Sequence, residues 1–253
     1  MHYELCIILG LLLLLIPAGA LYVFDKTQLR PFGIAVGRMV VQLLVVCRMV
    51  WLLVKYDKAW ISLLWFLLLA VVSGVFALRR MKLPLAKFLL PVSAGLFVGP
   101  LFVGLYLLFV ALPVKGGMDA SWFVPLTALL VGHSMTMCIR GLSAYRSALK
   151  ADEQQYEFLR GNGATHIKAL RPFLCRALVA VISPSVANLR VLALTSMPLL
   201  LVGLLMGGLS PINAFVVMLL MAVACVSVSI LALTIIIYLS DRILFDQYGK
   251  LIG

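Results

Sequence analysis

Charged side chains are scarce in this sequence. Only 12% of its 253 residues are Asp, Glu, Lys or Arg, whereas 64% are hydrophobic. An ordinary soluble domain has about 25% charged and about 45–50% apolar residues, so this chain has too little polar surface to cover a water-facing globule. The composition predicts an all-α, polytopic integral membrane protein, and its length leaves no room for a separate ATPase, kinase or dehydrogenase domain.

Several chemical motifs are also missing. The chain has no phosphate-binding loop of the form Gly-x-x-x-x-Gly-Lys-Ser/Thr, no His-Glu-x-x-His and no Gly-x-Ser-x-Gly. Its five cysteines stand singly, which excludes a disulfide framework or a zinc knuckle. We therefore expect no catalytic residue, no metal site and no cofactor bound by this chain.

The nearest approach to a metal site is a group of soft ligands in one apolar run, namely His133, Met135, Met137 and Cys138. Alternation at two residues does not place all of them on one helical face. We therefore interpret His133 as a hydrogen-bonded residue of the helix bundle rather than as a metal ligand.

Seven apolar runs are long enough to cross about 30 Å of hydrocarbon at about 1.5 Å per helical residue. They are Leu5–Phe24, Phe32–Val54, Trp60–Leu78, Phe88–Val114, Ala120–Ile139, Val186–Leu209 and Ala214–Leu239. No Asp or Glu lies in the interior of a run, which argues against a carrier coupled to protons or sodium ions. The sequence therefore predicts about seven transmembrane helices.

Basic residues outnumber acidic ones by 21 to 9, and the net charge is +12. They collect after the first, third and fifth runs, while the alternate connections carry little charge. Because Lys and Arg concentrate in cytoplasmic loops, the N-terminus is predicted outside and the C-terminus in the cytoplasm. The excess belongs to no basic tail or nucleic-acid module, so it indicates contact with lipid headgroups and no binding of nucleic acid.

One polar segment, from Gly141 to Arg176, is substantial. Its acidic residues precede its basic ones, as the helix dipole favours, and Gly161-Asn162-Gly163 predicts a helix C-cap and a turn before a second short helix. No internal repeat or flexible linker divides the chain. These features predict a single transmembrane domain over residues 1–253, with a cytoplasmic loop at about 141–176.

Close helix packing is predicted by Gly-x-x-x-Gly pairs inside the runs, because small residues let helix backbones approach. The pairs are Gly33/Gly37, Gly95/Gly99 and Gly203/Gly207. The alternative for each pair is a moving or dimer interface.

Arg38 is unusual because it lies within an apolar run without an acidic partner one or two turns away. Gln42 follows four residues later on the same helical face, so the two side chains are predicted to line one interhelical crevice. The alternative for Arg38, and for Arg48 in the same run, is that the guanidinium reaches the membrane interface.

A second group of polar and helix-breaking residues lies in the sixth run. It comprises Asn188, Arg190, Pro198 and Gly203, and Pro184 precedes them. Carbonyls freed by proline survive in lipid only where protein or a water-filled cavity satisfies them. We therefore expect a substrate path or gate here, and the alternative is a kink needed only for packing.

Several stretches together resemble a known family. They are Gly37-Arg38-Met39-Val40-Val41-Gln42-Leu43, Glu157-x-Leu-x-x-x-Gly163-Ala164-Thr165, Pro184, Arg190 to Pro198, Gly203 and Ser210-Pro211. In this order, over roughly residues 30 to 245, they are similar to the FetB/YbbM-type ABC transporter permeases. The resemblance implies a permease in the cell (inner) membrane that pairs with a second copy of itself and with a separate ATP-binding subunit. Family members are linked with iron export and metal resistance in bacteria, and with aluminium tolerance in plants.

The chain departs from this family in one stretch. The family typically has Leu-Pro-Gly-Met-Met-Thr/Ser-Gly, where this chain has Met197-Pro198-Leu199-Leu200-Leu201-Val202-Gly203. If the missing hydroxyl and methionines contact a metal or polar cargo in the family, this chain would carry a different cargo, such as an amphipathic or lipid-like molecule.

Taken together, the residues and the resemblance predict that this chain is the permease subunit of an ABC exporter, with a metal ion as the family's cargo. Two cytoplasmic ATP-binding subunits would hold ATP and magnesium and hydrolyse the ATP. The polar loop is then the coupling element, which would contact such a subunit through Glu157, Gly163, Ala164 and Thr165. The alternatives are a passive channel or anion pathway lined by arginines, and a membrane scaffold without transport.

Overall fold

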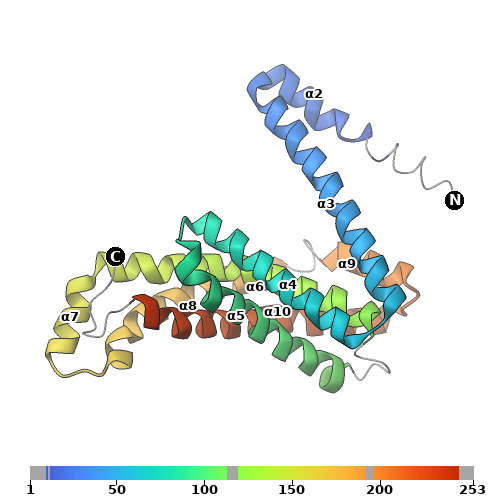
Figure 1. Cartoon of the computed structure of the whole chain (residues 1–253). Helices are drawn as coiled ribbons and strands as arrows, with labels where there is room; N and C mark the ends of the chain where they lie inside the picture. The colour runs from blue at the N-terminus through green and yellow to red at the C-terminus, as the bar shows by residue number, and fades with distance from the viewer. Residues whose placement is uncertain (1–9, 11, 113–118, 192–196, 245–253) are drawn as a thin grey trace. The chain divides into compact units, whose positions relative to one another are not determined.

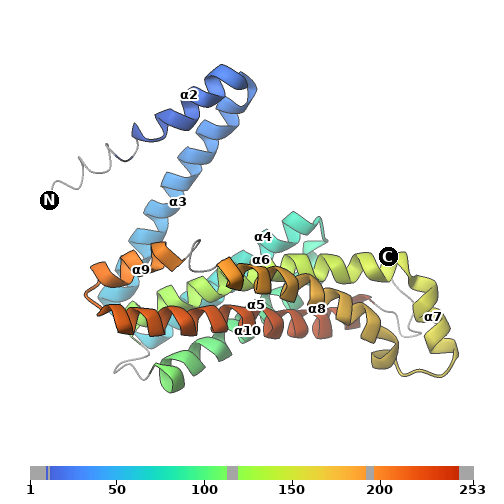
Figure 2. The same cartoon turned by 180° about the vertical axis from the view of Figure 1, so that it is seen from behind.

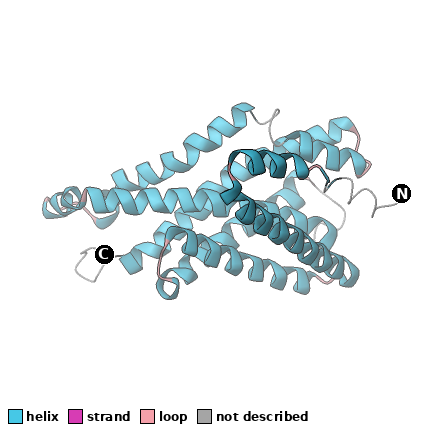
Figure 3. Ribbon diagram, turned by 90° about the horizontal axis from the view of Figure 1, so that it is seen from above, coloured by secondary structure: helices cyan, strands magenta, loops and turns pink. Residues whose placement is uncertain are grey.

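The computed structural model of the chain describes residues 10, 12–112, 119–191 and 197–244 (Figure 1). Every regular element in these ranges is a helix, as the single colour of the elements in Figure 3 shows. Six of the described helices have at least 18 residues and are apolar enough to cross a membrane. The prediction of an all-α, multi-pass membrane protein is therefore confirmed.

The chain divides into two compact units, and the N-terminal unit ends at Tyr56. Its described elements are α2 (Leu15–Phe24), a 3-10 turn (Lys26–Gln28) and α3 (Leu29–Tyr56). Asp25 separates α2 from the turn, because its backbone is extended and its carboxylate accepts a hydrogen bond from the Thr27 N–H at 3.0 Å. The second expected run lies within α3, and most of the first expected run before Leu15 lies outside the described residues.

The C-terminal unit begins at Asp57. Its elements are α4 (Ala59–Met81), α5 (Leu85–Tyr106) with a π-helical continuation (Leu107–Ala111), α6 (Ala120–Ala151), α7 (Glu153–Gly161), α8 (His166–Val191), α9 (Met197–Met206) and α10 (Pro211–Leu244). Figures 1 and 2 show α5 and α10 side by side along much of their length.

The structure corrects the sixth expected run, Val186–Leu209. The long helix here is α8, which begins at His166 inside the segment expected to be a polar loop, and a separate ten-residue helix, α9, follows. Hydropathy conceals the first half of α8 because its cations lie on exposed positions, while Ala169, Leu170 and Phe173 are buried. At about 1.5 Å per residue α9 is about 15 Å long, half of what a crossing needs.

Small residues bring the helices of the C-terminal unit together. A Cβ atom added to Gly99 of α5 would lie 3.1 Å from the Cβ atom of Ala232 and 3.2 Å from its Cα atom, so α5 and α10 pack backbone to backbone here. Gly141 of α6 plays the same part, since an added Cβ would lie 2.6 Å from the Leu233 side chain. The packing role predicted for the Gly95/Gly99 pair is confirmed.

One hydrogen bond and the helix lengths show which helix ends of this unit lie at the same level. The Ala120 N–H at the start of α6 donates to the Asp57 carboxylate just before α4 at 2.8 Å, so both helices start at one level. α6 has 32 residues and α10 has 34, which makes them about 48 and 51 Å long, well beyond about 30 Å of hydrocarbon. Each is therefore longer than a perpendicular crossing needs, and we call the end at which α7 lies the projecting end (Figures 1 and 2).

Candidate functional site

Asn188 and Arg190 lie in the last turn of α8. Both side chains are exposed, and neither forms a hydrogen bond or ion pair with another residue that the structure describes. His166, at the start of α8, is 4.0 Å from Asp241 at the projecting end of α10. Arg190 is about 36 Å along α8 from that level, which is more than the thickness of the hydrocarbon layer, so it lies far from the projecting end.

Pro198 and Gly203 belong to α9, not to the helix that carries Arg190. Pro198 is the second residue of α9, where a missing N–H leaves no helical hydrogen bond unmade, so it starts a helix rather than kinking one. α9 ends at a Gly207-Gly208 turn, in which Gly208 has φ +88° and the Leu209 N–H donates to the Leu204 carbonyl at 3.1 Å. The expected break falls between Val191, the last described residue of α8, and Met197 of α9, and residues 192–196 lie outside the described structure.

Arg38 and Gln42 both lie in α3, four residues apart, with exposed side chains. They belong to the N-terminal unit, whereas the other four path candidates belong to the C-terminal unit. Arg48 of the same helix stacks over the Trp51 ring at 4.6 Å. Because Trp collects at membrane interfaces, this contact supports the interpretation of Arg48 as a residue that reaches the interface.

The projecting end of the C-terminal unit carries all four predicted coupling residues. Glu157 lies on α7, and Gly163, Ala164 and Thr165 form the turn that leads into α8. Ala164 is half-buried and the other three are exposed. We call α7 with this turn, residues 153–165, the coupling tip.

The turn in the coupling tip closes α7 as the sequence predicts. Gly163 has φ +81°, its N–H donates to the Arg160 carbonyl at 3.0 Å, and the Ala164 N–H donates to the Leu159 carbonyl at 3.0 Å. This pair of bonds is the Schellman motif, which favours glycine because of the left-handed backbone. The helix that follows is the full-length α8 rather than the expected short one.

A chain of polar contacts fastens the coupling tip to the long helices. Tyr156, the buried residue of α7, has its hydroxyl 2.9 Å from Nδ1 of His166, and Nε2 of His166 is 4.0 Å from the Asp241 carboxylate of α10. The same carboxylate accepts a hydrogen bond of 2.6 Å from the Tyr145 hydroxyl of α6. Burial raises the pKa of Tyr156, so its hydroxyl stays protonated and can donate.

Sequence reasoning missed Tyr145, Tyr156 and Asp241 as members of this polar chain. A signal was nevertheless present, because a lone carboxylate that follows a long apolar run needs a partner once the helix packs. The partners lie 96 and 75 residues away in sequence, at Tyr145 and His166, and a pattern within one helix does not reveal them.

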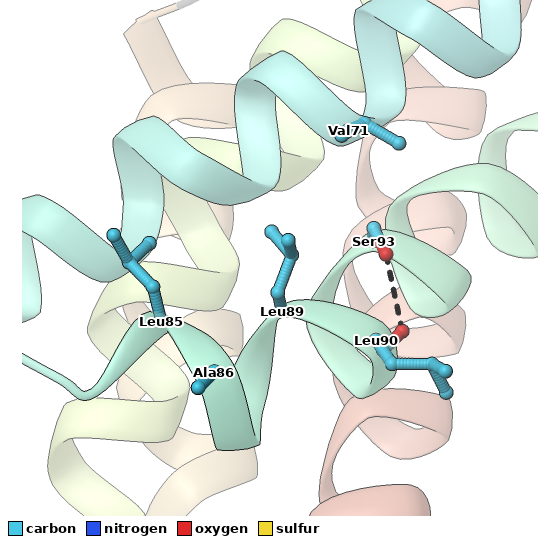
Figure 4. Close-up of a pocket in the computed structure, with 6 residues that line it drawn as sticks. All are labelled: Val71, Leu85, Ala86, Leu89, Leu90 and Ser93. Atoms are coloured by element: carbon cyan, nitrogen blue, oxygen red, sulfur yellow. Dashed lines mark hydrogen bonds between the residues drawn. The ribbon is translucent and has the colours of Figure 1, made fainter.

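The described residues contain no group of three or more His, Cys, Asp or Glu side chains that could hold a metal ion. The apolar groove between α4 and α5, shown in Figure 4, has a volume of 450 Å³. Its one hydroxyl, that of Ser93, already donates to the Leu90 carbonyl at 3.1 Å. Neither feature offers groups for catalysis.

Comparisons with known proteins agree with this architecture. Residues 4–245 match the family described as "Uncharacterised protein family (UPF0014)". The UPF0014 membrane protein slr1647 of Synechocystis sp. is 26% identical, and the alignment covers 85% of this chain and 83% of the relative.

Two further relatives carry names that mention a metal. The probable iron export permease protein FetB of Escherichia coli is 22% identical over 86% of this chain and 83% of its own length. The protein ALUMINUM SENSITIVE 3 of Arabidopsis thaliana is 26% identical over 62% of this chain and 56% of its own length. No solved structure gives a significant match.

Proposed function

Because this chain belongs to the UPF0014 family, whose members include a probable iron export permease, we propose that it is the permease subunit of an exporter driven by a separate ATP-binding subunit. Two copies of each subunit would form the transporter, and a metal ion is its proposed cargo. The observation that carries the proposal is the coupling tip, a polar helix and turn held at the projecting end of an otherwise apolar bundle.

The coupling tip has the surface of a docking element. Phe158 of the tip is 69% exposed, and Ile167, which follows the tip at the start of α8, is 73% exposed. Glu157 is exposed beside Phe158. Apolar side chains surrounded by polar ones on a water-facing element mark protein–protein contacts, and a cytoplasmic ATP-binding subunit is the partner that an exporter needs.

The polar contacts between the coupling tip and the long helices support the transmission of a movement of the tip to those helices. Tyr156 contacts His166, and His166 and Tyr145 both meet Asp241 at the end of α10. A displacement of α7 by an ATP-binding subunit would therefore act on α8 and α10 at once, because packed helices move as rigid elements. Both helices lead to α9, far from the projecting end.

The proposed gate is the change of helix from α8 to α9. Asn188 and Arg190 lie in the last described turn of α8, and Pro198 and Gly203 lie in α9. A short helix near a membrane boundary can tilt without breaking a full span, which suits a gate that opens by rigid movement. We propose that Arg38 and Gln42 of α3 line a further part of the path.

The division of labour follows from the groups that each subunit holds. This chain lacks a phosphate-binding loop, so ATP and magnesium would bind to the partner subunit, which would carry out the hydrolysis. The permease would supply the path, the gate and the coupling contact.

The test is the substitution Ala164→Glu at the half-buried position of the coupling tip. Docking would bury the new carboxylate without a partner, and an unpaired buried charge costs about 3–5 kcal/mol. We expect ATP-dependent accumulation of ferrous iron in inside-out vesicles to fall at least tenfold, and crosslinks from Glu157→Cys to the ATP-binding subunit to disappear.

Ala59→Glu is the matched control, because it makes the same change at an exposed residue on the opposite end of the bundle. It should leave both measurements unchanged. If Ala164→Glu assembled and accumulated iron like the parent, the coupling assignment would be wrong. ATP-independent conductance in liposomes lacking the ATP-binding subunit would favour a passive channel instead.

A further inference from the structure

A cavity with polar walls lies where the α4–α5 turn meets α6. Its volume is 180 Å³, and its lining is Met81, Leu83, Ser143, Arg146, Ser147 and Lys150. We call it the α6 cavity. Ser143 lies three and four positions before Arg146 and Ser147, and Lys150 lies four and three positions after them, so the four α6 residues share one face of the helix.

The α6 cavity offers donors and no acidic acceptor. Among the described residues, no carboxylate pairs with Arg146 or Lys150, and the hydroxyls of Ser143 and Ser147 form no hydrogen bond. The Arg146 guanidinium lies over the Phe88 ring at 5.9 Å, which orients it without neutralising it. Two cations and two hydroxyls around one small space form the donor set that binds phosphate oxygens.

The depth of the cavity matches the lipid headgroups. The Asp57–Ala120 hydrogen bond places the starts of α4 and α6 at one level. From there Met81 is about 33 Å along α4, and Ser143 is about 34 Å along α6. These positions lie just beyond about 30 Å of hydrocarbon, inside the headgroup layer of a bilayer that is about 40–45 Å thick in total.

An apolar groove begins two residues further along the same turn. Leu85 and Ala86 open it, and Leu89 and Leu90 continue it along α5 opposite Val71 of α4 (Figure 4). This groove contains no charged side chain. The α4–α5 turn thus has a cationic cavity with an apolar groove beside it. An anionic phospholipid has the complementary arrangement, a negatively charged headgroup joined to apolar acyl chains.

We propose that the α6 cavity binds the phosphate headgroup of an anionic phospholipid, whose acyl chain lies along the groove between α4 and α5. The exposed cations of the turn, Arg79, Arg80 and Lys82, add to the positive potential around the headgroup. Basic pockets between membrane helices on the cytoplasmic side recognise anionic lipids in this way. The site would hold α4, α5 and α6 together at the end that carries the coupling tip, and it does not depend on the proposed transport.

The direct test uses the unmodified chain in nanodiscs that contain equal amounts of phosphatidylglycerol and phosphatidylcholine. Native mass spectrometry after release from the nanodisc should show phosphatidylglycerol retained on the protein at least fivefold more often than phosphatidylcholine. Equal retention of the two lipids would overturn the proposal. Loss of the phosphatidylglycerol adduct on addition of millimolar inorganic phosphate would assign the cavity to free phosphate and would also overturn it.

The variant Arg146→Gln/Lys150→Gln removes both cations and keeps the side-chain lengths similar. Each cation near an anionic surface contributes enough for roughly a fivefold change in binding, so removing both should abolish the preference for phosphatidylglycerol. The control Lys168→Gln/Arg171→Gln removes two exposed cations of α8 at the same end, and it should keep the preference.

A second variant tests whether a loss of preference comes from the cavity itself rather than from a general loss of positive charge or of folding. Ser143→Ala/Ser147→Ala leaves all cations in place and removes only the two hydroxyl donors, so the fold should persist and the preference should fall about threefold. An unchanged preference in both cavity variants would show that the lipid binds elsewhere, and the proposal would be wrong.

Discussion

The two units contain similar apolar helices with the same glycine motif, but the motif is packed against another helix in only one of them. α3 of the N-terminal unit and α5 of the C-terminal unit are both long, apolar and marked by a Gly-x-x-x-Gly pair. An added Cβ at Gly33 or Gly37 would meet no atom of the described residues within 4 Å, whereas at Gly95 it would clash with Ile236 of α10 and at Gly99 it would be crowded by Ala232 of α10. The same motif therefore describes an open face in one unit and a closed interface in the other, because only the presence of a second helix distinguishes them.

Polar residues show the same contrast. In the C-terminal unit, Asp241 of α10 is partly buried and contacts Tyr145 and His166. In the N-terminal unit, Asp25 bonds only to its neighbour Thr27 among the described residues, and Arg38 is exposed. Long-range polar contacts thus accompany helix packing, and exposed polar residues of α3 stay available for lipid, cargo or a second copy of the chain.

Gly99→Leu against Gly37→Leu gives the largest expected difference between the units. Leu at position 99 would press into the backbone of Ala232, and overpacking of this kind costs about 1–3 kcal/mol or more. We expect Gly99→Leu to lower the thermal denaturation midpoint in detergent strongly, and Gly37→Leu to leave it near the parent value. If Gly37→Leu were equally damaging, the face of α3 would be packed against a partner in the protein.

Arg190→Ala and Arg38→Ala test whether both units contribute to the path. Loss of a hydrogen bond to a charged group is worth about 1.5–3 kcal/mol, so each substitution should lower ATP-dependent iron accumulation in inside-out vesicles roughly tenfold, with insertion and assembly intact. Arg48→Ala, which removes the residue stacked on Trp51 at 4.6 Å, is the control and should transport normally. Normal transport by both Arg38→Ala and Arg190→Ala would remove the site assignment.

A double-mutant cycle of Tyr145→Phe and Asp241→Asn sharpens the contrast in polar contacts. Because the two side chains share a hydrogen bond of 2.6 Å, their effects on the free energy of unfolding should be non-additive by about 1 kcal/mol. Tyr22→Phe and Asp25→Asn make the same chemical changes in the N-terminal unit, where the described structure has no bond between the two residues. That cycle should be additive, and additivity in both cycles would contradict the contact.

Metal content is expected to change least. The described residues hold no cluster of three or more ligands, so chelator-washed protein should contain far less than one iron or zinc per chain, and His133→Ala should not alter that value. Elemental analysis measures this directly. One tightly held metal per chain in the washed protein would mean that residues of both units, or of two copies, meet at a site.

The sequence by itself determined the membrane class and the turn that ends α7, whereas the described residues hold six long apolar helices rather than the seven predicted. Composition limits the solvent that can surround the chain, and Gly163 meets a backbone requirement that is local. For the same reason the coupling residues Glu157 and Gly163 to Thr165 were predicted as one group, since they are neighbours in the chain.

Only the tertiary structure decided where α8 begins and which glycines are packed. Hydropathy averages over all faces of a helix, so the amphipathic first half of α8 appeared as a loop until its buried face was seen against α6. The Tyr156–His166–Asp241–Tyr145 contacts and the α6 cavity likewise join residues from different helices. No pattern along one helix contains them, because they form only when packing brings distant ends of the chain to the same level.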